Sequence, residues 1–197
     1  VVPPTVDAVE EFLCFTDFDP DHSFGPLLPD SRAATVWSVA VNGVMAGCRP
    51  EYMPVLCAVA EALADPGRYA EEVFGLVVWK RQAEFLRACR DHGRVSVTSG
   101  HKTGKSTSFA VLAWWFTADA ASRPGARVVL SSASARQVKT ILWREVKALH
   151  RRAVARGYDL PAPALDPETG VRWEDGREIL GFTARDPEKM AGVSGAH

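Results

Sequence analysis

The sequence has few cysteines and no long hydrophobic run, and each shortage excludes a class of protein. Cys14, Cys48, Cys57 and Cys89 lie far apart without C-x-x-C spacing. We therefore expect reduced thiols in a cytoplasmic protein, not disulfides or zinc ligands. No apolar run approaches the roughly 18 residues that a membrane-spanning helix needs. The first residues lack the basic start of a secretory signal, so we expect no membrane partner.

The net charge of −1 hides a strong asymmetry along the 197 residues. Residues 1–75 hold 12 Asp and Glu against 3 Lys and Arg, a net of −9, whereas residues 76–197 hold 12 against 20, a net of +8. A break of this size indicates modules with different partners, and the basic half suits a nucleotide or nucleic acid. We expect a small, mostly helical module of unknown role at 1–66, a linker at 67–75 and a larger module at 76–197.

Hydrophobic periodicity predicts an alternation of helices and strands in the larger module. The predicted elements are a helix over 77–91, a strand over 94–98, a helix over 106–119, a strand over 126–132, a long helix over 134–156 and a β-hairpin over 171–183. This order indicates an α/β domain with a parallel sheet and right-handed crossovers. In the small module the predicted helices cover 5–14, 32–45 and a third segment that begins at Pro50 or Pro54 and ends at Ala64.

The segment that joins the strand at 94–98 to the next helix has the layout of a phosphate-binding loop. It matches the pattern G-x-x-x-x-G-K-[ST], except that Ser99 replaces the first glycine. Lys105 would be the catalytic lysine that reaches the β- and γ-phosphates, and the Ser106 hydroxyl would bind Mg²⁺. The predicted nucleotide-binding residues are Ser99, Gly100, His101, Lys102, Thr103, Gly104, Lys105, Ser106 and Thr107.

Residues 76–197 resemble the N-terminal ATPase part of a large terminase subunit, the DNA-packaging motor of tailed bacteriophages. The resemblance rests on four passages: Trp79 to Gln82, the loop at 99–107, the strand and helix at 126–145 that include Gln137 and Trp143, and residues 181–195. It implies an incomplete P-loop NTPase-like sheet, with Gln82 against adenine and ATP and Mg²⁺ as cofactors. The implied partners are double-stranded DNA, the portal and the small terminase subunit, in the cytoplasm of a bacterial host.

One part of the family pattern is absent after Lys105. Terminases continue with a hydrophobic strand that ends in Asp-Glu (the Walker B strand) and with a nuclease region, and neither lies before His197. Phosphoryl transfer needs a positioned metal ion and water. We therefore expect this chain to bind ATP but to hydrolyse it poorly alone, unless Asp186 or Glu188 supplies the carboxylate.

Alternative interpretations remain open at this point. The loop also suits another P-loop NTPase, such as a helicase-like protein, or a non-enzymatic remnant. Residues 34–55 resemble bacterial proteins with a Cys/Sec-Gly-Ser-Cys redox motif, which is absent here, so the chain is either a two-module protein or a fused reading frame. The helix at 134–156 carries a basic stripe that either contacts DNA phosphates or is simply solvated. The stripe consists of Arg136, Lys139, Arg144, Lys147, Arg151 and Arg152.

Overall fold

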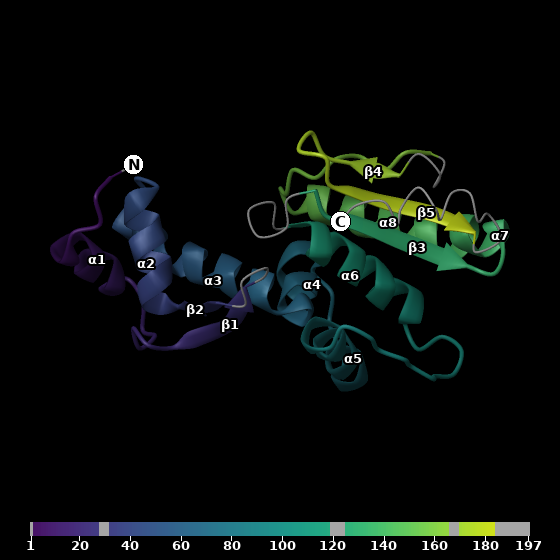
Figure 1. Ribbon diagram of the computed structural model, residues 1–197, viewed down its shortest axis with the longest axis horizontal. Helices are drawn as coiled ribbons and strands as arrows, with labels where there is room; N and C mark the ends of the chain where they lie inside the picture. The colour runs from purple at the N-terminus through teal and green to yellow at the C-terminus, as the bar shows by residue number, and fades with distance from the viewer. Residues whose placement is uncertain (1, 28–31, 119–124, 166–169, 184–197) are drawn as a thin grey trace.

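The computed structural model combines helices with two small sheets (Figure 1) and describes residues 2–27, 32–118, 125–165 and 170–183. In these residues the buried hydrophobic side chains form two separate clusters. The smaller cluster draws on residues between Val9 and Cys57, and the larger one on residues between Ala62 and Ile179. No helix in the described ranges is both long and apolar enough to cross a bilayer.

Three helices build the smaller cluster, and all three were predicted. They are α1 (Val6–Leu13), α2 (Val36–Met45) and α3 (Met53–Ala64), the last preceded by the short 3₁₀ helix η1 (Pro50–Tyr52). Gly43 inside α2 serves close packing. A Cβ atom at Gly43 would lie 2.7 Å from the Phe12 ring, so only glycine lets α1 approach α2 this closely.

A two-stranded ribbon precedes α2 and was not predicted. Strand β1 (Ser23–Leu27) pairs antiparallel with β2 (Arg32–Thr35), so the first residues of the helix predicted over 32–45 are extended instead. The helix begins at Val36 because Thr35 and Ser38 form a capping box, with each side chain bonded to the backbone N–H of the other.

The expected linker at 67–75 is instead the helix α4 (Pro66–Phe74). Proline at the first helical position favours a helix start, and the Asp65 side chain caps it. Tyr69, Ala70, Val73 and Phe74 join the larger cluster. The two modules are therefore joined through packed helices, and their separability stays a prediction.

The larger cluster lies against a mixed three-stranded sheet in the order β3–β5–β4. Strand β3 (Arg127–Ser132) pairs in parallel with β5 (Glu178–Thr183) along its whole length, and β4 (Val171–Arg172) pairs antiparallel with β5. These elements confirm the second predicted strand and the hairpin. They also place the carboxyl ends of β3 and β5 at the same edge of the sheet (Figure 1).

The helices of the larger module also follow the prediction. They are α5 (Lys80–Asp91), α6 (Lys105–Ala118), and a continuous helical segment of α7 (Ala135–Gln137), the π-helical η2 (Val138–Leu142) and α8 (Trp143–Ala155). The Trp114 indole of α6 is fully buried and donates to the Val146 carbonyl of α8 at 3.3 Å. The two helices are thereby held against each other beside the sheet.

The strand predicted over 94–98 is the main correction in this module. These residues have no strand assignment and pair with no strand in the described part of the chain. Their alternating valines favour extended structure, but Val95 and Val97 are 38% and 42% exposed. A strand is stabilised by a neighbouring strand, which residue preferences alone do not supply.

Candidate functional site

The predicted phosphate loop closes on itself around the lysine that begins α6. The Lys105 Nζ atom donates to the Ser99 and Gly100 carbonyl oxygens at 3.0 and 2.5 Å. The Ser99 and Thr103 hydroxyls are hydrogen-bonded at 2.9 Å, and Thr103 also donates to the Gly100 carbonyl at 3.2 Å. The loop is therefore compact, with the Lys105 ammonium bound to carbonyl oxygens at its beginning.

Two backbone positions with positive φ give the loop its shape. Gly104 has a φ of 79° and Lys102 a φ of 58°, a region that costs a side-chain-bearing residue conformational energy. A Cβ atom at Gly104 would also lie 2.2 Å from the Gln82 amide nitrogen, whereas a Cβ at Gly100 would meet nothing within 4 Å. The positive φ of Gly104 therefore favours glycine there, and the Gln82 side chain would have to move for any larger residue, whereas Gly100 faces open space.

Helix α5 brings Gln82 to the loop. The helix begins after its N-cap residue, Trp79, and places Gln82 in the first turn. Phe85 of α5 packs edge-on against Phe109 of α6, with ring centroids 5.5 Å apart. This contact holds the two helices together, so Gln82 lies against Gly104 although 22 positions separate them in the sequence.

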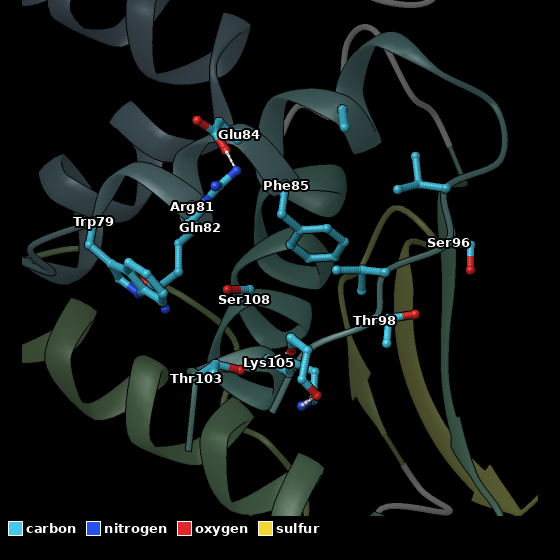
Figure 2. Close-up of a pocket in the computed structure, with 14 residues that line it drawn as sticks. Trp79, Arg81, Gln82, Glu84, Phe85, Ser96, Thr98, Thr103, Lys105 and Ser108 are labelled. Carbon is cyan, nitrogen blue, oxygen red and sulfur yellow. Dashed lines mark hydrogen bonds and ion pairs between the residues drawn. The ribbon is translucent and has the colours of Figure 1, made fainter. Parts of the chain in front are cut away.

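A first cleft, of about 470 Å³, lies between α5 and the residues around the loop. Figure 2 shows Trp79, the N-cap of α5, and Phe85 of α5 on one side of it and Thr98 and Lys105 on another. It therefore combines aromatic surface, a carboxamide and the Lys105 ammonium. The lining residues are Trp79, Arg81, Gln82, Glu84, Phe85, Ala88, Val95, Ser96, Val97, Thr98, Ser99, Thr103, Lys105 and Ser108.

A second cleft, of about 570 Å³, lies at the carboxyl end of β3. Lys105 borders both clefts, and Ser106 and His101 line the second one. Crevices at the carboxyl ends of parallel strands are the usual ligand sites of open α/β sheets. The lining residues are His101, Lys105, Ser106, Phe109, Val129, Leu130, Ser131, Ser132, Gln137, Ile141 and Leu142.

Thr107 is oriented differently from its neighbours in the loop. Its hydroxyl donates to the Glu145 carboxylate of α8 at 3.0 Å. The contact ties the first turn of α6 to α8, so Thr107 serves packing between these helices. Glu145 was not singled out from the sequence, since a residue 38 positions away gives no local signal of this pairing.

Two side chains of the basic stripe make contacts within the chain. Within the stripe, Lys147 donates to the Leu165 carbonyl at 2.9 Å and Arg144 pairs with Glu145 at 3.5 Å.

Asp186 and Glu188 lie outside the described residues. The described residues also hold no group of three or more His, Cys, Asp or Glu side chains arranged for a metal ion.

Comparisons with protein-family models, with curated proteins and with solved structures found no match to this chain.

Proposed function

We propose that residues 99–107 bind the phosphates of Mg-ATP, as the phosphate loop of a P-loop NTPase does. The carrying observation is the position of Lys105, which begins a 14-residue helix and borders both clefts. The first N–H groups of a helix lack intrahelical partners, and the helix dipole favours an anion there. The open space around Gly100 leaves room for a phosphate beside the backbone.

Lys105 is the main phosphate ligand in this proposal. Its ammonium now contacts two neutral carbonyl oxygens, and hydrogen bonds between ionised partners are shorter and stronger than those to neutral ones. A phosphate that enters the loop therefore competes well for the ammonium. When Lys105 exchanges the Ser99 and Gly100 carbonyl oxygens for a phosphate, the compact loop that these hydrogen bonds close is opened.

Ser106 suits the metal-binding role because it lines the cleft that Lys105 also borders. Mg²⁺ is usually held by few protein ligands together with substrate phosphates and water. When bound, the ion would supply charge neutralisation at the phosphates. The chain's own contribution is the Ser106 hydroxyl and the fixed start of α6, which Thr107 ties to Glu145.

The adenine base fits the first cleft in this arrangement. Trp79 and Phe85 provide aromatic surface for a planar ring, and the Gln82 carboxamide has both a donor and an acceptor for the base edge. Gln82 also contacts the loop at Gly104. The Gln82 side chain can therefore contact both the base and the phosphate loop.

We propose a terminase-like packaging ATPase acting on double-stranded DNA as the wider function. It is supported by the terminase resemblance, by the proximity of Gln82 to the loop and by the basic stripe of the α7–η2–α8 segment. A helicase-like NTPase is the alternative that shares the same nucleotide site. The portal and the small terminase subunit are proposed partners by resemblance alone.

The proposal is tested by equilibrium binding of a fluorescent ATP analogue with Mg²⁺ to the full chain. Lys105→Ala should weaken binding by roughly 10- to 150-fold, because it removes a hydrogen bond to a charged group worth about 1.5–3 kcal/mol. Lys147→Ala removes the same charge from α8, away from both clefts, and should leave binding unchanged. Equal affinities of the wild type and Lys105→Ala would rule out the assignment.

A further inference from the structure

Gln137 stands at the carboxyl end of β3, on the second cleft. The Ser132 hydroxyl donates to its Oε1 atom at 2.8 Å, and its backbone N–H donates to the Ser134 hydroxyl at 3.2 Å. Gln137 is exposed, and exposed glutamines usually keep their rotamer freedom. Here two hydrogen bonds hold the residue at the mouth of a cleft.

The bond from Ser132 also sets the polarity of the carboxamide. With Oε1 accepting from Ser132, the other end of the amide is the NH₂ group, which only donates. A donor at this position suits an anionic oxygen. Because Lys105 and Ser106 line the same cleft, an anion bound there would meet donors from both α6 and Gln137.

The backbone beside Gln137 is irregular. The π-helical η2 follows it directly, and Ile141 and Leu142 of η2 line the same cleft. Short π-helical segments inside α-helices occur often at functional sites. The wall of the cleft thus contains a polar anchor and a distorted helical turn side by side.

We infer that Gln137 contacts the terminal phosphate of the bound nucleotide and makes the site distinguish a triphosphate from a diphosphate. The inference rests on the proposed function. With the base in the first cleft and the phosphate chain passing Lys105, which borders both clefts, the far end of the chain reaches the second cleft. Gln137 is a ligand-selecting residue at that end, opposite Gln82 at the base.

The test compares Mg²⁺ complexes of ADP and of a non-hydrolysable ATP analogue by titration calorimetry on the full chain. Gln137→Ala should weaken the analogue by about tenfold, the loss of one charge-assisted hydrogen bond, and leave ADP binding unchanged. Gln82→Ala is the matched control at the other end of the nucleotide. It should weaken both ligands by the same factor.

Gln137→Glu keeps an oxygen that accepts from Ser132 and replaces the donor with a negative charge. It should lower the affinity for the analogue further than Gln137→Ala does, while far-ultraviolet circular dichroism stays that of the wild type. Equal effects on both nucleotides, or none on either, would overturn the role of Gln137 while leaving the loop assignment intact. If the wild type binds neither nucleotide, the proposed function and this inference fail together.

Discussion

Asp65 links the start of α4 to α5, and the effect of its removal on the free energy of unfolding can be estimated from its contacts. Its carboxylate, only 14% exposed, caps α4 by accepting from the Gly67 and Arg68 N–H groups at 2.7 and 3.2 Å. It also accepts from Arg87 of α5 at 2.9 Å and lies 3.5 Å from the Arg90 guanidinium. A single side chain thus fixes the start of α4 and the position of α5.

Asp65→Ala should lower the free energy of unfolding by about 1.5 kcal/mol. Loss of the N-cap costs about 1 kcal/mol. The Arg87 pair adds only about 0.5 kcal/mol, because that guanidinium is 55% exposed and screened by solvent. Asp65→Asn keeps a good cap and should lose only about the second amount. Asp91→Ala removes a surface carboxylate paired with Arg90 and should change stability by less than about 0.5 kcal/mol.

The effect of Asp65 should also depend on pH. Burial alone would raise the pKa of Asp65, but hydrogen bonds from Arg87 and from the Arg68 and Gly67 backbone outweigh it, so the pKa lies below its ordinary value. The stabilisation is therefore present above about pH 4, the unfolded-state pKa, and is lost as the pH falls through the lowered folded-state pKa.

Urea unfolding at pH 7 and pH 3, followed by circular dichroism, measures both effects of Asp65. The difference between the wild type and Asp65→Asn should shrink at pH 3. The reasoning is refuted by an Asp65→Ala variant as stable as the wild type at pH 7, or by a difference that is the same at both pH values.

Three further predictions concern other positions. Gly104→Ala should weaken nucleotide binding and destabilise the chain by about 1–2 kcal/mol through its positive φ, whereas Gly100→Ala, at an open position, should leave stability unchanged; equal losses of stability in urea unfolding would contradict this. Trp115→Phe should cost about 2 kcal/mol in urea unfolding, because it deletes the 2.9 Å bond from the buried indole to the Leu63 carbonyl; an unchanged midpoint would contradict it. Burial, followed by the nearby Tyr158, raises the pKa of Tyr69 far above its ordinary value, so the neutral form stabilises the fold below about pH 10 and this contribution is lost as the pH rises further. Tyr69→Phe should therefore flatten the alkaline loss of stability, and an identical pH profile in both proteins would show that Tyr69 is not responsible.

The helices were largely predictable because their signal is local. Apolar residues at helical spacing identify α5 and the α7–η2–α8 segment without knowledge of what they pack against. The strand predicted over 94–98 and the linker predicted over 67–75 were wrong because these segments depend on contacts with distant parts of the chain. Residues 94–98 have strand-forming side chains but no strand beside them, and Pro66 starts a helix whose buried face belongs to the larger cluster.

In the candidate site, too, the features encoded by a contiguous motif were predictable, and the contacts between residues far apart in the sequence were not. The loop and Lys105 follow from a contiguous motif, so the sequence alone identifies them as a phosphate-binding candidate. The terminase resemblance implies that Gln82 lies against adenine, whereas its position beside Gly104 had no sequence signal, since it depends on how α5 packs on α6. The bond from Thr107 to Glu145 had no sequence signal, because it depends on the packing of α6 against α8.

The most direct test of the account is an NMR titration of the ¹⁵N-labelled full chain with Mg-ATP, followed through the backbone amide signals. The proposal that residues 99–107 hold the phosphates predicts the largest shifts there, with smaller ones at Gln82, and loss of these shifts in Lys105→Ala. Inorganic tripolyphosphate with Mg²⁺ should move the loop signals but not that of Gln82 to the same extent. Shifts confined to other parts of the chain, or none with either ligand, would contradict the phosphate-loop assignment.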